Sequence, residues 1–264
     1  MTNALGRTET RTDQVRLGML AQMAVTLGVP VPNGLPPLWH WTLFQHWAPS
    51  DELGPDGHPI RGAFIPALPE LPRRMWAGGR VRFLGPLQAG DAVTRVSTIR
   101  AVRDTVGRSG RLVFVTVHHA ITGPSGLAID EEQDLVYRGL DGAATVSAEP
   151  VAEASPGPRQ TLVPDPVLLF RYSALTGNGH RIHYDLDHVR QVEGYPGLLV
   201  HGPLQATLML GLLPSTVARF HYRALRPAFH GAALRIEAWR EAGLMKVRTR
   251  DPSGAVCMEG EAAL

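Results

Sequence analysis

The sequence predicts an α+β protein in which one unit, a helix packed against an antiparallel sheet, is made twice in a single chain. Two observations support this prediction. Apolar residues alternate with polar ones over four segments in each half of the chain, which is the period of half-buried strands. The frame R-x-x-x-P-x-x-x-G occurs at residues 82–90 and again at 223–231, at the same point of the strand order in each half. A helix wrapped by an antiparallel sheet and then duplicated accounts for both observations.

The composition is that of an ordinary globular protein. Of 264 residues, 44% are hydrophobic and 19% charged, and no apolar run reaches the roughly 20 residues of a membrane span. The net charge of +2 is small and evenly spread, so we expect no nucleic-acid partner. The polar N-terminal stretch carries acids among its arginines, which predicts a cytoplasmic protein without a targeting signal. The single cysteine, Cys257, excludes an internal disulfide and a cysteine-cluster metal site.

The first unit is predicted over residues 1–140. Residues 13–27 have the apolar spacing of a helix, and three of the five tryptophans follow between positions 39 and 47. These tryptophans are either a core anchor or an apolar wall for a ligand. Residues 48–79, rich in Pro and Gly, read as a long functional loop. At its end, Arg73, Arg74 and Trp76 either hold a phosphorylated ligand or bind loop carbonyls.

Four strands are predicted to complete the first unit. They span residues 81–87, 93–102, 112–121 and 127–137. The acidic run at 130–134 lies on the last of them. Because consecutive residues of a strand face opposite sides, we expect a solvated edge there and not a metal site.

The second unit repeats this order over residues 161–264, after a linker at 141–160 that is mostly Ala, Pro, Gly, Ser and Glu. A short helix at 165–176 precedes a loop rich in His and Asn, and an apolar helix follows at 204–213. The strands are predicted at 218–225, 234–240, 244–250 and 256–262.

Two segments of the second unit carry a resemblance to a known family. Residues 176–185, T-G-N-G-H-R-I-H-Y-D, and 193–204, E-G-Y-P-G-L-L-V-H-G-P-L, resemble the signature of the double-hotdog hydratases and dehydratases of acyl thioesters. The most similar branch is that of the type 2 hydroxyacyl-thioester dehydratases and mesaconyl-CoA hydratases, relatives of the MaoC enzymes. Residues 35–41, 72–79 and 131–138 resemble the same branch. The resemblance implies a double-hotdog fold, with a substrate-binding N-terminal repeat and a C-terminal repeat that carries the catalytic motif.

The resemblance also implies roles for three residues. Aligned on the last His of the MaoC pattern G-D-x-N-P-L-H, His183 takes the general acid/base position, which suits a side chain whose pKa lies near neutral pH. Asn178 takes the Asp position, where an amide orients water but takes up no proton. The amide of Gly202, at the start of the apolar helix, is implied as an oxyanion donor.

The remaining site predictions concern substrate binding. We expect the substrate to contact Gly177, His180, Arg181, Tyr184, His201, Arg73, Arg74 and Trp76. His180 and His201 are either second titrating groups or structural histidines. Gly177 stands where the most similar branch carries a large aromatic residue, which suggests room for a longer or branched acyl chain, or for a nucleophile larger than water.

The expected activity is reversible hydration of the α,β bond of an acyl thioester carried on coenzyme A or on an acyl-carrier protein. We expect no metal or redox cofactor, and a homodimer. Three alternatives keep the same fold. The enzyme could add an amino-acid amine to an unsaturated thioester, or hydrolyse the thioester. The chain could also be a non-catalytic acyl-binding subunit in which Asn178 marks a lost reaction.

Overall fold

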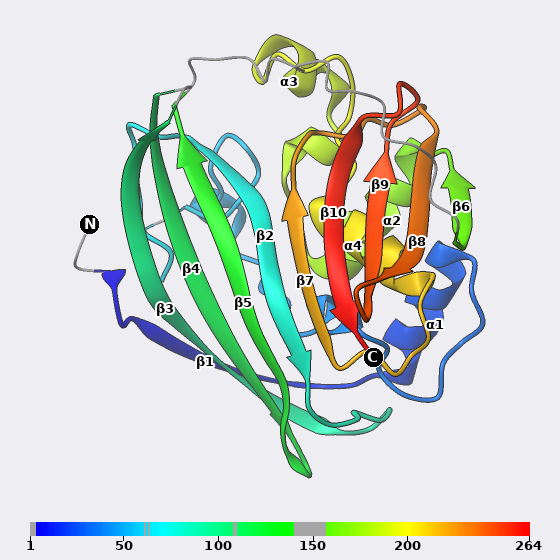
Figure 1. Cartoon of the computed structure of the whole chain (residues 1–264). Helices are drawn as coiled ribbons and strands as arrows, with labels where there is room; N and C mark the ends of the chain where they lie inside the picture. Colours follow the sequence, from blue (N-terminus) through cyan, green and yellow to red (C-terminus); the bar gives the residue numbers. More distant parts are fainter. Residues whose placement is uncertain (1–3, 61, 63, 108–109, 140–156) are drawn as a thin grey trace.

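The fold is described from a computed structural model, which describes residues 4–60, 62, 64–107, 110–139 and 157–264 (Figure 1). The predicted linker at 141–160 lies largely outside the described residues. Among the helices in those ranges, none has both the length and the apolar character needed to cross a membrane.

A ten-stranded sheet in the order β1-β3-β4-β5-β2-β7-β10-β9-β8-β6 runs through the molecule. Every pair of neighbouring strands in it is antiparallel. The first repeat supplies β1 (Thr8–Gln14), β2 (Arg73–Phe83), β3 (Ala92–Gly107), β4 (Gly110–Gly123) and β5 (Gly126–Arg138). The second supplies β6 (Arg159–Leu162), β7 (Arg219–Ala224), β8 (Leu234–Glu241), β9 (Leu244–Arg250) and β10 (Val256–Ala263).

The two repeats meet where β2 pairs with β7. Arg80 lies opposite His221, and Gly78 lies opposite Arg223. A Cβ at Gly78 would overlap the backbone carbonyl of Tyr222, so this close strand pairing requires glycine. On either side of the joint the strand order is mirrored, which is the arrangement expected of a duplicated unit.

The backbone hydrogen bonds repeat as the strands do. The Leu84 amide donates to the Ala128 carbonyl at 2.7 Å, and the Leu225 amide donates to the Cys257 carbonyl at 2.8 Å. Leu84 and Leu225 occupy the same place in the two copies of the frame R-x-x-x-P-x-x-x-G. The duplicated α+β architecture predicted from that frame is therefore confirmed.

The helices are α1 (Leu17–Leu27), α2 (Pro166–Thr176), α3 (Leu186–Gln191) and α4 (Gly202–Gly211), with single 3-10 turns η2 (Trp39–Thr42), η3 (Ser50–Glu52) and η4 (Arg181–His183). The helices lie behind the strands of the second repeat, except for the α3 helix, which lies at the top of the view beyond the strand ends (Figure 1). Helix α4 is the central helix of the second repeat, and every residue from Leu204 to Leu210 is buried.

The helix predicted for the first repeat is α1, whereas the segment of that repeat that corresponds to α4 forms only a single turn. The bridge Gly34↔Gln88 in the first repeat corresponds to Leu199↔Phe229 in the second, yet it leads only into η2 and not into a helix like α4. Leu38 and Phe44, on either side of η2, have φ of 69° and 59°. Left-handed residues at both ends limit the segment to one turn.

The core has two parts. The larger cluster fills the space between the helices and the strands of both repeats, and it includes Leu20, Leu169, Leu204, Phe220 and Tyr222. The smaller cluster lies against β3, β4 and β5, where Leu68 and Leu71 of the long loop cover the strands. The loop thus covers part of the first repeat's sheet. Trp39, one of the three clustered tryptophans, is buried, so the interpretation as a core anchor holds for this residue.

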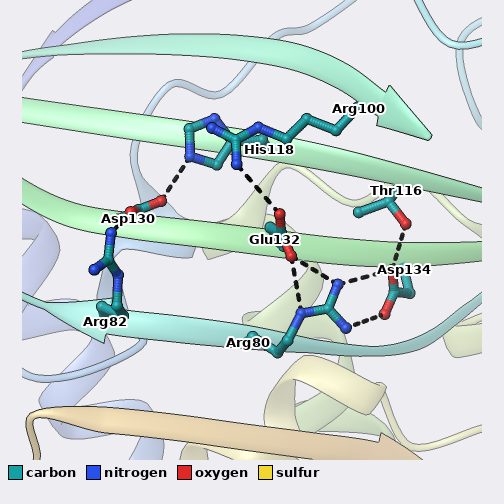
Figure 2. A network of polar contacts seen from close by, with 8 residues as sticks. All are labelled: Arg80, Arg82, Arg100, Thr116, His118, Asp130, Glu132 and Asp134. Atoms are coloured by element: carbon teal, nitrogen blue, oxygen red, sulfur yellow. Dashed lines mark hydrogen bonds and ion pairs between the residues drawn. The ribbon is translucent and has the colours of Figure 1, made fainter. Parts of the chain in front are cut away.

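The acidic run at 130–134 lies inside the sheet and not at a solvated edge, because β5 is flanked by β4 and β2. The expected alternation is present. Asp130, Glu132 and Asp134 reach the outer face, where they form ion pairs with Arg82, Arg80 and Arg100 (Figure 2). Glu131 points inward and is only 2% exposed. Its carboxylate is bound by His40 at 3.0 Å and by the Trp41 indole N–H at 2.8 Å.

Strand β1 was not predicted, and strand β2 begins earlier than predicted. The chain enters β1 at Thr8, so the helix predicted from residue 13 begins only at Leu17. Strand β2 begins at Arg73, within the stretch predicted to be a loop. Arg73, Arg74 and Trp76 are therefore strand residues.

Candidate active site

The predicted motif follows helix α2, whose ends are set by local sequence. Asp165 caps the first turn by accepting a hydrogen bond from the Leu168 amide at 2.7 Å, and Pro166 begins the helix. Gly177 ends it in the left-handed conformation, with φ of 60°. The chain then turns through residues 178–180 into η4, which ends at His183.

His183 has a fixed tautomer. Its Nδ1 lies 2.8 Å from the Leu199 carbonyl oxygen, and because a carbonyl only accepts, Nδ1 carries the proton. The lone pair is then on Nε2. The His201 ring stacks on His183 with centroids 3.5 Å apart and planes 17° apart. Behind it, the Ser173 hydroxyl is hydrogen-bonded to His201 Nε2 at 2.8 Å.

These histidines are neutral at pH 7. Burial lowers the pKa of His183 to about 4, although the hydrogen bond to Leu199 opposes the shift. Burial and the neighbouring His58 and His183 lower the pKa of His180 to about 2. The pKa of His201, which is fully buried, is also well below its usual value. His183 is thus a base with an available lone pair, and His201 supports it from behind.

Asn178 turns its side chain back onto the loop. The side-chain Oδ1 accepts a hydrogen bond from the backbone amide of His180 at 3.0 Å. The backbone N–H of Asn178 donates to the Ser173 carbonyl at 2.9 Å. The oxygen of the side chain is used in the turn, so the Nδ2 donors are its means of binding a further oxygen atom.

Gly202 begins helix α4 and lies beside the joint of the two repeats. A Cβ at this position would lie 3.6 Å from both Trp76 Cε3 and Met258 Cε, so the glycine faces the inner side of β2 and β10. Trp76 packs edge-on against Trp41 and Tyr222, with ring centroids 4.7 Å and 5.6 Å away. The predicted Trp76 and Gly202 are brought together, and an aromatic wall stands beside the amide predicted to bind an oxyanion.

Two predicted substrate residues bind their own chain. Arg181 forms an ion pair with Asp185 at 2.7 Å and donates to the Pro55 carbonyl at 3.0 Å. The Tyr184 hydroxyl donates to the Gly179 carbonyl at 3.0 Å. The Arg181 side chain thus links the motif to the loop at 54–58, and the Tyr184 side chain stabilises the motif itself.

The two predicted arginines, Arg73 and Arg74, make different contacts. Arg73 forms an ion pair with Glu193 at 3.1 Å and also donates to the Glu193 backbone carbonyl, so it ties β2 to the segment after α3. Arg74 lies close enough to His180 for its charge to contribute to the lowered pKa of that imidazole. Of the two, Arg74 is the one whose charge acts on the motif.

Asp56 and His58 were missed by the sequence analysis. They belong to the long loop of the first repeat, yet the His58 ring lies 4.2 Å from the His180 ring, measured between centroids. The Asp56 carboxylate accepts from His58 Nδ1 at 3.2 Å. The two residues were predicted only as part of the loop at 48–79, and the motif that they meet lies more than a hundred residues away in the sequence.

Asp56, His58 and His180 have potential ligand atoms that all lie within 4.8 Å of one another. Two of the three are already joined by the 3.2 Å hydrogen bond between Asp56 and His58. We therefore interpret the group as a hydrogen-bonded acid and imidazole beside a third ring, and not as a set of metal ligands.

Comparison with known proteins identifies the family of the chain. The model of the family described as "Hydroxyacyl-thioester dehydratase type 2" matches residues 38–230. The chain is 43% identical to the Mesaconyl-C(4)-CoA hydratase of Chloroflexus aurantiacus, over 98% of this chain and 96% of that protein.

Solved structures share the fold at low identity. HtdX of Mycobacterium tuberculosis has a TM-score of 0.71 at 17% identity, over 97% of this chain and 99% of that one. A second protein of the same organism, described as a double hotdog, has a TM-score of 0.57 at 15% identity, over 98% and 95% of the two chains. The fold is thus a double hotdog.

Proposed function

The chain belongs to the hydroxyacyl-thioester dehydratase type 2 family of hydro-lyases, and from that premise we propose that His183, Asn178 and the Gly202 amide carry out reversible hydration of an α,β-unsaturated acyl thioester. The observation that supports these roles most directly is the fixed tautomer of His183. With Nδ1 donating to Leu199, the imidazole presents a basic Nε2 at neutral pH.

In the dehydration direction, His183 Nε2 removes the proton from Cα. The negative charge that develops on the thioester oxygen needs a hydrogen-bond donor. Gly202 is the first residue of α4, where backbone N–H groups have no partner within the helix and the helix dipole is positive. One such donor is worth about 3 kcal/mol of barrier in comparable sites.

Asn178 has a different task. Its Oδ1 is occupied by the His180 amide, so it can donate from Nδ2 to the oxygen bound at Cβ. An amide neither gains nor loses a proton at pH 7. Asn178 orients the water or hydroxyl but does not move its proton.

The substrate class follows from the relative that covers nearly the whole chain. Identity of 43% to a Mesaconyl-C(4)-CoA hydratase favours a short, branched, dicarboxylic acyl thioester of coenzyme A. A phosphopantetheine arm on an acyl-carrier protein presents the same thioester, so the carrier-bound form is the second candidate. In either case the carrier arrives with the substrate, and we propose no resident metal or redox cofactor.

The amine-addition alternative gains no support from the region around Gly177. A Cβ there would meet the Gln45 side chain at 3.3 Å, and the left-handed backbone explains the glycine without an open space. Thioester hydrolysis and loss of catalysis are outcomes that the following experiment distinguishes.

The experiment is mass spectrometry of purified protein with a panel of 2-enoyl thioesters, including mesaconyl-C4-CoA and a carrier-bound crotonyl group, with and without mixed amino acids. We expect a gain of one water that is lost in His183→Ala and kept in His221→Ala, an exposed histidine on β7. An amine adduct, a free acid, or no change despite binding would each replace the proposal with the corresponding alternative.

The oligomeric state is a separate proposal. Strands β1 and β6 are the edges of the sheet, and unpaired edges of this kind are where copies of a sheet protein associate. We infer a homodimer, for which light scattering should give about twice the 28.6 kDa of the chain.

A further inference from the structure

We propose that Asp56 and His58, which the loop of the first repeat contributes, form the second acid–base pair of the site and move the proton at the Cβ oxygen. This inference rests on the proposed function, since it completes the same reaction. Dehydration requires two proton transfers at different atoms, one from Cα and one to the departing hydroxyl. His183 serves the first, and the amide of Asn178 cannot serve the second.

The Asp56 side chain holds the His58 ring in one orientation. One carboxylate oxygen accepts from His58 Nδ1 at 3.2 Å, and the other accepts from the His58 backbone amide at 3.1 Å. Because the carboxylate fixes the proton on Nδ1, the proton that His58 exchanges is the one on Nε2. This is the same division of the two ring nitrogens that Leu199 imposes on His183.

The loop is locked onto the motif by its backbone. The Asp56 carbonyl accepts from the Arg181 amide at 2.9 Å. Gly57 and Gly179 pass so closely that a Cβ on Gly57 would overlap the Gly179 carbonyl. This contact places the His58 ring against His180, and the His180 and His183 centroids are 5.7 Å apart. The His180 ring is therefore a direct neighbour of both His58 and His183.

The charges around His58 make it the imidazole best suited to hold a second proton. Asp56 is bonded to it, His180 and His183 of the motif lie nearby, and Arg74 of β2 acts on the adjoining His180. His183 and His180, with pKa values of about 4 and 2, are neutral at pH 7. A carboxylate beside His58 stabilises an imidazolium, and neither of the other two rings has such a bond.

Dehydration moves one proton from Cα and a second proton to the departing hydroxide. His183 Nε2 takes the Cα proton, and the electron pair of the C–H bond forms the Cα–Cβ double bond through the enolate as the Cβ–O bond breaks. The departing hydroxide takes the Nε2 proton of the His58 imidazolium and leaves as water. His183 ends protonated and His58 neutral, and proton exchange with solvent restores both. Hydration is the reverse.

The test compares two leaving groups in the full-length enzyme. A 3-hydroxyacyl thioester needs an acid at the oxygen, whereas the 3-chloroacyl analogue loses chloride without a proton. We expect His58→Gln and Asp56→Asn to lower kcat for dehydration about 100-fold with little change in KM, and to leave chloride elimination within a few-fold of wild type. His183→Ala should lose both reactions.

The matched control is His118→Gln, which removes the imidazole of another His–Asp pair, bonded to Asp130 at 2.6 Å on the outer face (Figure 2). It should leave both reactions unchanged. Equal losses of dehydration and chloride elimination in His58→Gln would make the loop purely structural, and no loss would also overturn the proposal. So would activity that EDTA removes and zinc restores, because the group would then bind a metal. If wild type catalyses neither reaction, the proposed function itself fails.

Discussion

The rings of His183 and His201 are stacked, with centroids 3.5 Å apart and planes inclined by 17°. Because Ser173 holds His201 from behind, the stack limits how far the basic ring can tilt. We expect His201→Ala to lower kcat about tenfold with a small effect on KM, and to lower the free energy of unfolding by about 2 kcal/mol because it leaves a cavity.

Steady-state kinetics and thermal unfolding check this prediction. Ser173→Ala is the control, since it removes one hydrogen bond to His201 and keeps the ring stack. We expect it to lower the free energy of unfolding by about 1 kcal/mol. An unchanged kcat in His201→Ala would show that the stack does not position His183.

The Gly202 amide is tested by removing its hydrogen. Pro at the first helical position leaves a helix intact, and His201 before it has the extended φ and ψ of −56° and 135° that a following proline requires. We expect Gly202→Pro to fold and to lose about 100-fold or more in kcat. Gly202→Ala keeps the amide and makes only ordinary contacts, so its kcat should stay within about tenfold of wild type. Circular dichroism and kinetics of both variants measure the contrast, and equal losses would exclude the oxyanion role.

The lowered pKa of His183 predicts that the enzyme stays active at a lower pH than an ordinary histidine base would allow. Because burial holds this pKa at about 4, chloride elimination from a 3-chloroacyl thioester should keep its rate well below pH 6.5 and fall only near pH 4. The unfolded chain binds this proton first, so the contribution of His183 to stability is complete above pH 6.5 and is lost as the pH falls toward 4. A pH profile of kcat/KM with an acid limb at 6.5 would contradict the buried, neutral imidazole.

Gly177→Phe tests whether glycine is needed here for its backbone conformation or for the space that it leaves. With φ of 60° and Gln45 at 3.3 Å, a side chain here is strained, and we expect about 1 kcal/mol of destabilisation with equal losses on short and long acyl thioesters. Gly177→Asn, which tolerates the left-handed conformation, should be milder. Melting temperatures and a chain-length series give the answer. Selective loss of long substrates at unchanged stability would restore the interpretation of Gly177 as extra room.

Glu131 joins β5 to the tryptophan segment from inside the core. Burial opposes its ionisation, but His40, His119 and Gln133 together outweigh burial and lower the pKa of Glu131 to about 2. We expect Glu131→Ala to lower the free energy of unfolding by about 3 kcal/mol, because it leaves His40 and the Trp41 indole without this acceptor. Its contribution is complete above pH 4.5 and is lost as the pH falls toward 2.

Chemical denaturation measures the effect of Glu131→Ala. Glu132→Ala, on the outer face of the same strand, should cost less than about 1 kcal/mol. Similar losses in the two variants would contradict the buried pair.

The sequence predicted most of the sheet because its strands alternate apolar and polar residues. It missed β1, whose residues, T-E-T-R-T-D-Q, are all polar, so no apolar period marks this edge strand. It also read the start of β2 as a loop, since Gly78 and Gly79 are typical of turns. In the structure they are needed for close approach to Tyr222, a tertiary contact that local sequence does not encode.

The motif around His183 could be predicted because it is contiguous. The approach of Asp56 and His58 could not, since it depends on how a loop of one repeat folds over the other. The structure also gave Arg181 and Tyr184 internal partners, which charge and residue type alone do not distinguish from ligand contacts.

The mirrored strand order has a consequence for how such a chain can evolve. Two similar halves share one sheet, but within the described parts of the chain the long central helix and the His-rich turn belong to the second half alone. In the proposed mechanism each polypeptide has one reaction centre, to which the second half contributes the motif around His183 and the first half contributes the loop with Asp56 and His58. Because these contributions lie in different halves of one chain, one of them can change in sequence without the same change in the other. In an assembly of identical single units, every substitution would appear in all the copies at once.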